Sequence, residues 1–485
     1  MGRAASIVLL AAWLAAAGAC TDAGGDAAPD AGGAAVADGT LGFPAGFRWG
    51  VATSAFQTEG HVENDYTDWI PTASTPAYRE ACDSWNRWQE DVGLAAGLGA
   101  RVFRMSVEWA RIEPEEGRFD DAALAHYRDV VRAVRDAGME PLVTLHHFTN
   151  PRWVAAAGGW ADPGIADRFS RYAGEVAARL GDLVDDWNPQ NESMVYVVGL
   201  GLVNAYPGGA LNDLTRLRRT YRAAVFANAA AADAIRERDG VDADGDGRPT
   251  TVWLVHAMSP TFPADPADQA SVAAAARWDR FYNRSWVDAL VRGALDLDFD
   301  GRTDGAPDGL AEGVFAELAG RVDVIGVNYY NRVFVVPAPG LVPNVDAIPC
   351  LRGMQCGAPS PEAGDNGNEV YPPGLYQALA EMAPYGLPLA VSENGVADRD
   401  DDLRPAYLVR HVAQVHRAIE DGMDVRAYLH WSLLDNYEWA DGYTMKFGLF
   451  AVDFTTQART PRGSADLYRR VIQGNGLAPD MPGME

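Results

Sequence analysis

Lysine is almost absent from this 485-residue sequence: Lys446 is the only one, and arginine supplies the remaining positive charge. Acidic side chains outnumber basic ones by 67 to 40, which gives a formal net charge of -27. A surface of that sign repels phosphate backbones and anionic lipid headgroups. The composition therefore argues against nucleic acid as a partner.

Cysteine is also scarce, with four in the chain, and cysteine and histidine do not cluster with the spacing of a metal site. Cys350 and Cys356 lie in a stretch rich in Pro and Gly. In an exported protein such a pair is a candidate disulfide, and two free thiols are the alternative.

Long hydrophobic runs are missing: the apolar stretch 7–17 is too short to span a bilayer as a helix. It follows Arg3 and leads through small residues to Cys20, which is typical of an export signal over residues 1–20. Residues 14–20 resemble a bacterial lipobox, so we expect a lipidated Cys20, with simple signal-peptidase cleavage as the alternative. Residues 21–42, mostly Ala, Gly and Asp, predict a flexible tether. We expect a bacterial protein that is lipid-anchored to the cell envelope or secreted.

From residue 43 onward, short apolar runs bounded by Gly, Pro or charge alternate with longer helical patterns. The runs predict buried parallel strands at 47–54, 101–109, 140–147, 185–192, 251–258, 322–330, 388–393 and 425–434. Helical periodicity is clear at 121–137, 165–180, 213–238 and 404–421. Eight strands in this alternation predict an α/β fold, a single (β/α)8 TIM barrel over residues 43–475, with a short tail at 476–485.

Polar and aromatic side chains gather where these strands end, the face on which a TIM barrel carries its active site. Glu192 ends the fourth strand and Glu393 the seventh, so both carboxyl groups are expected at the barrel mouth. Retaining glycosidases need such a pair, one as nucleophile and one as acid and then base. Two glutamates that merely close loops are the alternative interpretation.

Six motifs make residues 43–471 resemble glycoside hydrolase family 1, the β-glucosidase family. They are residues 54–60 (SAFQTEG), 104–109 (RMSVEW), 144–148 (TLHHF), 328–330 (NYY), 391–395 (VSENG) and 431–439 (WSLLDNYEW), the last followed by Phe447-Gly448. The resemblance implies a retaining, cofactor-independent β-glycosidase with Glu192 as acid/base and Glu393 as nucleophile. It also implies that Arg104, Asn328 and Tyr330 support the nucleophile, and that the sugar binds to Gln57, His147, Asn191, Trp431, Glu438, Trp439 and Phe447.

An exo-acting β-glucosidase on glucosides or short oligosaccharides is the expected function. The alternatives are β-galactosidase or β-fucosidase specificity, transglycosylation, and a surface-anchored glycan-binding protein on an inactive barrel. Two stretches depart from the family. Ser193 stands where a proline usually follows the acid/base, and residues 61–69 (HVENDYTDW) replace a familiar Ser-x-Trp-Asp segment, which leaves the aglycone side open.

Two acidic loops begin like calcium-binding loops, because alternating aspartates followed by glycine let hard oxygen ligands converge on one ion. Neither has the final glutamate of an EF-hand, and acidic turns on an acidic surface are the alternative. The candidate structural calcium ligands are Asp242, Asp244 and Asp246 in one loop and Asp296, Asp298, Asp300 and Asp304 in the other.

Overall fold

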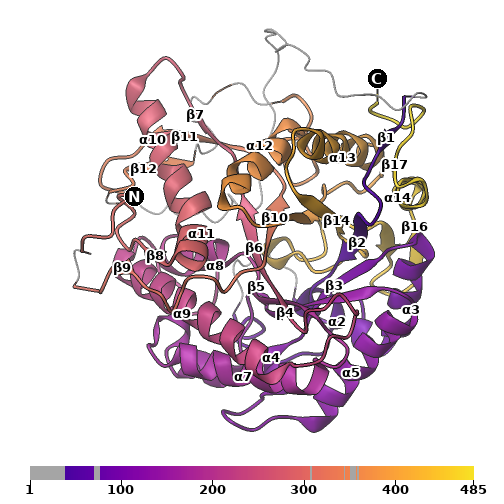
Figure 1. The fold of residues 1–485 in the computed structure, drawn as a ribbon, viewed down its shortest axis with the longest axis horizontal. Helices are drawn as coiled ribbons and strands as arrows, with labels where there is room; N and C mark the ends of the chain where they lie inside the picture. The colour runs from indigo at the N-terminus through magenta and orange to yellow at the C-terminus, as the bar shows by residue number, and fades with distance from the viewer. Residues whose placement is uncertain are drawn as a thin grey trace.

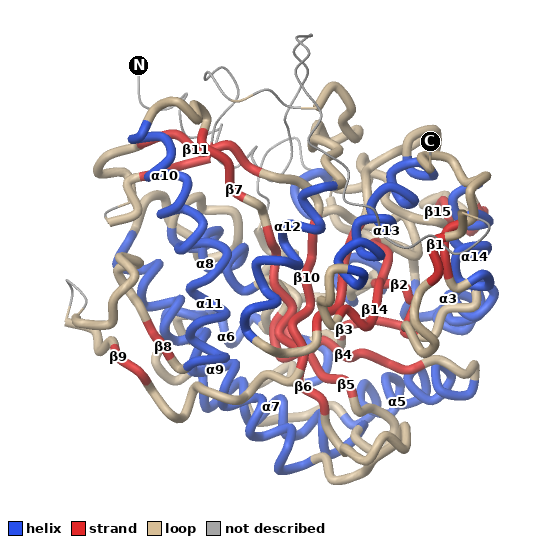
Figure 2. Tube along the Cα trace, turned by 45° about the horizontal axis from the view of Figure 1, so that its top comes forward, coloured by secondary structure: helices blue, strands red, loops and turns tan. Residues whose placement is uncertain are grey.

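The structure, a computed structural model, describes residues 39–69, 77–305, 309–342, 344–349, 357 and 360–484. Eight parallel strands close into a barrel in the order β10-β13-β14-β2-β3-β4-β5-β6. Figures 1 and 2 show these strands at the centre with helices around them. The predicted α/β barrel is confirmed. The strands are β2 (Arg48–Ala52), β3 (Val102–Ser106), β4 (Glu140–His146), β5 (Asp186–Gln190), β6 (Thr251–Met258), β10 (Val324–Tyr329), β13 (Leu389–Asn394) and β14 (Val425–Trp431).

The barrel strands are buried on both faces, which explains why most of their sequences are apolar runs rather than alternating ones. Strand β5 (DWNPQ) is the exception, because it is mostly polar although every residue is buried. Every residue of β3, β5, β10 and β13 is buried. Each strand lies within or close to its predicted range, and β6 coincides with it. Gln57, predicted to bind the sugar, lies on the short helix α2 (Ala55–Glu59) that follows β2.

Helices follow the strands and cover the barrel from outside (Figure 1). Two begin with an aspartate that caps them: Asp120 accepts hydrogen bonds from the first backbone N–H groups of α5, and Asp213 does so for α9. The main outer helices are α3 (Ser84–Leu98), α5 (Asp121–Asp136), α7 (Ile165–Leu180), α9 (Leu214–Arg238), α12 (Pro373–Met382), α13 (Arg404–Glu420) and α14 (Gly463–Gly474).

Several smaller elements decorate this frame. Helix α10 (Gln269–Asp279) packs on a small sheet of β7 (Thr261–Pro263), β11 (Val333–Pro337) and β12 (Ala347–Pro349) beside the barrel mouth. The remaining elements are α4 (Trp109–Ile112), α6 (Arg152–Ala156), η2 (Gly159–Ala161), α8 (Ser193–Gly201), η3 (Arg280–Arg284), α11 (Ser285–Val287), η4 (Asp288–Arg292), β8 (Ala294–Leu295), β9 (Gly313–Val314), η5 (Ala383–Tyr385), η6 (Trp439–Asp441), β15 (Phe450–Val452) and β16 (Arg459–Pro461).

Two short strands join the ends of the folded unit. Strand β1 (Leu41–Gly42) pairs antiparallel with β17 (Gly476–Leu477). These strands lie outside the expected limits of 43 and 475, and Met481, in the predicted tail, is buried in the core. No helix among the described residues has the length and apolar character needed to cross a membrane. The expected signal at residues 1–20 with Cys20, most of the tether, and the Cys350–Cys356 pair lie outside the described residues.

Candidate active site

The predicted site residues come from seven different barrel strands or the segments that follow them. Arg104 lies in β3 and Asn328 in β10, whereas Glu393 is the penultimate residue of β13. The pairing register between β10 and β13 shifts just before Asn328, and Asn328 then lies opposite Glu393. A shift of this kind re-aims side chains at the end of a strand. It brings the polar ends of two neighbouring strands to one point at the barrel mouth.

Both oxygens of the Glu393 carboxylate are held by donors. Arg104 donates to Oε1 through Nη1, and the Tyr330 hydroxyl donates to Oε2 at 2.6 Å. Arg104 is fully buried, so its positive charge acts at close range in a low-dielectric setting. Burial and the charge of Glu393 raise the pKa of Tyr330 well above its usual range, which keeps this hydroxyl a donor. Glu393 is therefore fixed in position by an arginine and a tyrosine.

Glu192 has a different environment. Its Oε1 accepts one hydrogen bond, from Asn328 Nδ2 at 2.8 Å, and no arginine contacts it among the described residues. Burial, followed by the nearby charge of Glu393, raises the pKa of Glu192 to about 8. The prediction that Asn328 supports Glu393 is corrected here, because its side chain donates to Glu192 instead. Asn328 is held in turn by Ser392, whose hydroxyl donates to Asn328 Oδ1 at 2.7 Å. The two buried glutamates thus lie close enough for their charges to interact, with Glu192 protonated near neutral pH.

The turn that carries Glu192 departs from the family pattern, and the structure shows how it is held. Glu192 has φ 46°, in the left-handed region, which is uncommon for a residue other than glycine. Such strain persists where the surroundings over-determine it. Ser193, in place of the usual proline, donates through its hydroxyl to Gln190 Oε1 at 2.8 Å, and Gln190 donates to the Ala224 carbonyl on α9. The hydrogen bond of Ser193 thus helps to hold the turn that carries Glu192.

A cluster of hydrogen-bonding side chains lies beside the two glutamates. Gln57 donates to Glu438 Oε2 at 3.2 Å, and Trp431 Nε1 donates to Glu438 Oε1 at 3.2 Å. Burial raises the pKa of Glu438 to about 8. Asn191 accepts from Arg104 and contacts His147 Nε2 at 3.3 Å. These donors and acceptors suit the hydroxyl groups of one sugar.

Aromatic rings frame the same cluster. The His147 ring is nearly parallel to Trp439, with their centroids 6.1 Å apart. Phe447 packs with Trp431 in a small apolar cluster and contacts the Tyr330 ring edge-on at 6.1 Å. Flat apolar faces beside polar groups fit the C–H surface of a sugar. The structure thus brings together all twelve residues that the sequence predicted for this site.

Sequence reasoning missed two residues of the site. Asn436 accepts from Gln57 Nε2 at 3.0 Å, and Ser392 orients Asn328. Both lie inside motifs already singled out, at residues 431–439 and 391–395. Their position in those motifs was the available signal, but which side chain each one contacts depends on the folded barrel.

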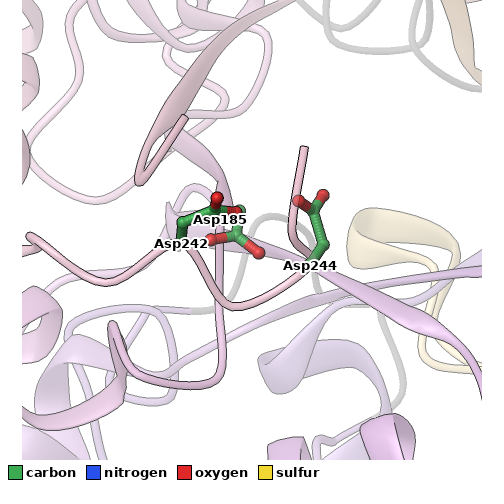
Figure 3. Close-up of side chains that lie close together, drawn as sticks. All are labelled: Asp185, Asp242 and Asp244. Carbon is green, nitrogen blue, oxygen red and sulfur yellow. The ribbon is translucent and has the colours of Figure 1, made fainter. Parts of the chain in front are cut away.

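The acidic loops lie away from this site. Asp242 and Asp244 gather with Asp185, which directly precedes β5 and so lies at the opposite end of the barrel (Figure 3). The second group combines Asp296 and Asp298 with Glu312. Asp185 was not predicted because it is far along the chain from its loop, and Glu312 was not predicted because it lies eight residues beyond Asp304, outside the loop motif. The other candidates, Asp246, Asp300 and Asp304, are not members of these two groups, and structural calcium remains a prediction.

Two interacting buried carboxyl groups at the mouth of a (β/α)8 barrel, beside hydrogen-bonding and aromatic side chains that suit a sugar, define the class: the protein is a glycoside hydrolase. Comparison with known proteins gives the family. The sequence model of glycosyl hydrolase family 1 matches residues 40–477, and the chain belongs to this family. The family is one of retaining glycosidases whose chemistry requires no cofactor.

Named relatives cover nearly the whole protein. The β-galactosidase of Pyrococcus woesei is 31% identical over 90% of this chain and 98% of its own length. The thermostable β-glucosidase B of Thermobispora bispora is 35% identical, covering 91% of this chain and 93% of its own. The solved structure of the family 1 β-glucosidase from Thermotoga maritima superposes with a TM-score of 0.81 at 29% identity, covering 90% of this chain and 99% of that one.

Proposed function

We propose that this protein is an exo-acting β-glucosidase in which Glu393 is the nucleophile and Glu192 the acid/base. The observation that carries the assignment is the contrast between the two carboxyl groups. Arg104 and Tyr330 hold both oxygens of Glu393, which stabilises an ionised nucleophile. In the part of the chain that the structure describes, Glu192 has neither an arginine nor a tyrosine partner, and burial raises its pKa to about 8, which suits a proton donor.

The reaction proceeds by double displacement. Glu393 attacks the anomeric carbon while Glu192 donates its proton to the glycosidic oxygen, so the aglycone leaves as an alcohol and the sugar is bound as an ester. Glu192, now ionised, removes a proton from water, which attacks the anomeric carbon and releases Glu393. The second inversion restores the β configuration. When Glu393 forms the ester, its carboxylate loses its negative charge. Tyr330 can keep its hydrogen bond to the oxygen of Glu393 that is not bonded to the sugar.

The substrate sugar is proposed to be glucose with free 4- and 6-hydroxyl groups. Gln57 and Glu438 are linked to each other and offer a paired donor and acceptor to such hydroxyls. The relatives named β-glucosidase support glucose. Galactose, which differs from glucose only in the orientation of the 4-hydroxyl, is the second candidate, because other relatives are named β-galactosidase. The same donors and acceptors can bind the 4-hydroxyl in either orientation.

The products formed with azide test the two roles. With an aryl β-glucoside that has a good leaving group, Glu192→Ala still forms the ester, and azide attacks it to give a β-glycosyl azide. Glu393→Gly has no nucleophile, so azide attacks the substrate directly and gives an α-glycosyl azide. NMR of the products reads the configuration. The same anomer from both variants, or full activity in either without azide, would reject the assignment.

Hydrolysis of a panel of aryl β-glucosides, β-galactosides and β-fucosides tests the sugar. We expect the largest kcat/KM for the glucoside. A larger value for galactoside would transfer the proposal to β-galactosidase, and binding of all glycosides without turnover would support the glycan-binding alternative. The intact Arg104–Glu393–Tyr330 arrangement opposes that last alternative, because a binder has no use for a fixed nucleophile.

We also propose that the protein is exported and lipid-anchored through Cys20. The sequence at residues 14–20 and the Ala/Gly/Asp-rich stretch after it support an anchor followed by a tether. Fractionation of bacterial cells expressing the full chain and its Cys20→Ala variant tests this. We expect the parent in the membrane fraction and the variant in the soluble exported fraction. An unchanged distribution would exclude the anchor.

A further inference from the structure

The segment that departs from the family after Gly60 is held against the barrel mouth by two consecutive buried residues. Asn64 and Asp65 are almost inaccessible to solvent, although they lie in the loop that follows α2. They face Thr149 and Asn150, which lie just beyond β4 and directly after His147 and Phe148. Two pairs of adjacent residues thus join two loops of the active-site face.

Asp65 and Asn150 are joined by three hydrogen bonds. The Asn150 backbone N–H donates to Asp65 Oδ1 at 2.8 Å, and Asn150 Nδ2 donates to Oδ2 at 2.8 Å. The Asp65 backbone N–H donates to the Asn150 carbonyl at 3.0 Å. Asn150 itself is fixed, because its Oδ1 accepts from Trp160 Nε1 at 2.7 Å and its Nδ2 also donates to the Tyr196 hydroxyl at 2.8 Å.

Glu108, which lies just beyond the end of β3, makes the second link. Its Oε1 accepts from Asn64 Nδ2 at 3.3 Å, and Thr149 Oγ1 donates to its Oε2 at 2.9 Å. Glu108 is buried, and burial raises its pKa to about 7. Buried acceptors that lose a donor are costly, so these contacts resist separation of the two loops.

A residue next to each of the two joined loop segments contacts the ring of Trp439, which lies beside the proposed sugar-binding cluster. Tyr66, next to Asp65, meets the Trp439 ring edge-on with centroids 5.3 Å apart. Phe148, next to Thr149, meets the same ring at 5.3 Å. Trp439 is therefore packed between two loops whose separation is set by Asp65–Asn150 and Asn64–Glu108–Thr149.

We propose that Asp65 and Glu108 are positioning residues that fix Trp439 for sugar binding. They belong to a clasp, which consists of Asn64 and Asp65 on one loop and of Glu108, Thr149 and Asn150 on the other side. This inference rests on the proposed role of Trp439 in the sugar site. It gives residues 61–69 a function: they anchor the aromatic wall of the pocket through buried carboxylates. The contacts act equally on the bound substrate and the transition state, so they govern KM more than kcat.

Asp65→Asn is the sharpest test, because the amide keeps the shape of the carboxylate. One oxygen still accepts from the Asn150 backbone, but the NH2 group of the new amide then faces the NH2 group of Asn150. We expect KM for the parent's preferred aryl glycoside to rise about tenfold, with kcat within about threefold of the parent. A buried structural residue with no effect on the pocket would lower the unfolding temperature and leave KM unchanged.

The reciprocal double variant Asp65→Asn/Asn150→Asp provides the rescue. The side-chain amide introduced at position 65 can donate to the new carboxylate at position 150, which still accepts from Trp160, while the Tyr196 hydroxyl reverses to become a donor. We expect KM to return to within about threefold of the parent value, which makes the two substitutions strongly non-additive. Failure of the double variant to recover would reject a clasp that acts through this pair.

The matched control is Arg152→Ala. Arg152, on α6, also ties the 61–69 segment, but through exposed ion pairs with Glu63 and Asp68, both at 2.7 Å. Exposed pairs contribute little, so KM should stay within about twofold of the parent. An equal rise in KM for Arg152→Ala would show that general loosening of the segment, and not the clasp, sets sugar affinity.

If Asp65→Asn does not fold, Glu108→Gln decides the matter. Its oxygen still accepts from Thr149, and only the Asn64 contact is lost, so we expect a smaller rise in KM, about threefold. An unchanged KM in a folded Glu108→Gln protein would overturn the proposal. The parent's own turnover on the glycoside panel tests the proposed function separately, since the clasp is judged by the ratio of variant to parent KM.

Discussion

At the bottom of the barrel, where the strands begin, the carboxyl groups of Glu140 and Asp186 lie against Arg48, whereas at the mouth carboxyl groups outnumber the arginines that contact them. Arg48, at the start of β2, donates to Glu140 at 3.0 Å and to Asp186 at 2.8 Å. Burial raises the pKa of Asp186, but Arg48 directly opposes this rise. These groups line a cavity of about 680 Å³ at that end.

At the mouth, Glu192, Glu393 and Glu438 share one described cationic contact, which Arg104 makes with Glu393. Burial therefore dominates for the other two, and it raises the pKa of each to about 8. Paired charge at the bottom stabilises the fold, while unpaired acid at the mouth retains protons for chemistry. The same residue types thus serve opposite purposes at the two ends of one barrel.

Removing the positive charge at the mouth should have the largest effect. Arg104→Met leaves Glu393 buried without its cation and removes a partner of Asn191. Breaking a buried pair in this way costs about 3–5 kcal/mol, and if the cost falls on the ionised nucleophile, kcat/KM drops about 10²- to 10⁴-fold. Steady-state kinetics on the best aryl glycoside measures it.

Tyr330→Phe is the milder companion of that variant, since it removes one neutral donor from Glu393 and leaves the cation in place. We expect about a tenfold loss of kcat/KM, in line with one hydrogen bond to a charged group. An Arg104→Met enzyme that was as active as Tyr330→Phe would mean that the buried cation is not what keeps Glu393 reactive.

The pH profile should show the unpaired acid at the mouth. Glu192 donates its proton, so kcat/KM should be present below its pKa and fall as pH rises through about 8. Glu192→Gln should lower kcat by about 10²- to 10⁴-fold on glycosides with poor leaving groups and should remove this alkaline limb. Because Glu438 has a pKa raised to a similar value, persistence of the limb in Glu192→Gln would assign it to Glu438 instead.

The raised pKa of Glu192 also makes its contribution to stability fall as pH rises. The pKa of Glu192 is higher in the folded protein than the ordinary value of 4.5 in the unfolded chain, so the folded state binds the proton more tightly. Its contribution to stability is fully present below about pH 4.5 and is lost as pH rises toward 8. Glu192→Gln cannot ionise, so its stability relative to the parent should increase over that window, as thermal unfolding would show.

Much of the fold could be predicted from the sequence, because a strand buried on both faces is usually a short run of apolar residues, which is recognisable without knowledge of distant contacts. The run 251–258 predicted β6, and the periodicity of 165–180 predicted α7. The site residues were predictable because barrel geometry sends every strand end to one face, so Glu192 and Glu393 could be placed together without coordinates.

Long-range choices of partner were not readable. Nothing local connects Asp65 with Asn150, or Asp185 with Asp242, because each contact depends on how loops fold over the barrel. Residues 61–69 in particular have no helical or strand periodicity. Because they also depart from the family pattern, the resemblance gave no prediction of their role. The helix that carries Gln57 was missed for a similar reason, since five residues are too few to show a helical period.

The smallest effect on activity is expected at the bottom of the barrel. Arg48→Met leaves Glu140 and Asp186 without their shared cation. Because the pair is mostly buried, we expect a loss of about 3–5 kcal/mol in the free energy of unfolding. Glu192 and Glu393 lie at the other end of the strands, so kcat/KM measured well below the unfolding temperature should stay within about twofold of the parent.

Arg426→Met is the control on the same face, because Arg426 pairs with Asp424 at 2.7 Å with both side chains more than half exposed. Such a pair contributes at most about 1 kcal/mol, so denaturant unfolding should separate the two variants clearly. A drop in kcat/KM for folded Arg48→Met, with little loss of stability, would mean that removing a charge at the bottom of the barrel changes catalysis at the mouth through the strands. The two ends of the barrel would then be coupled, and the division between stabilising pairs and catalytic acids would not hold.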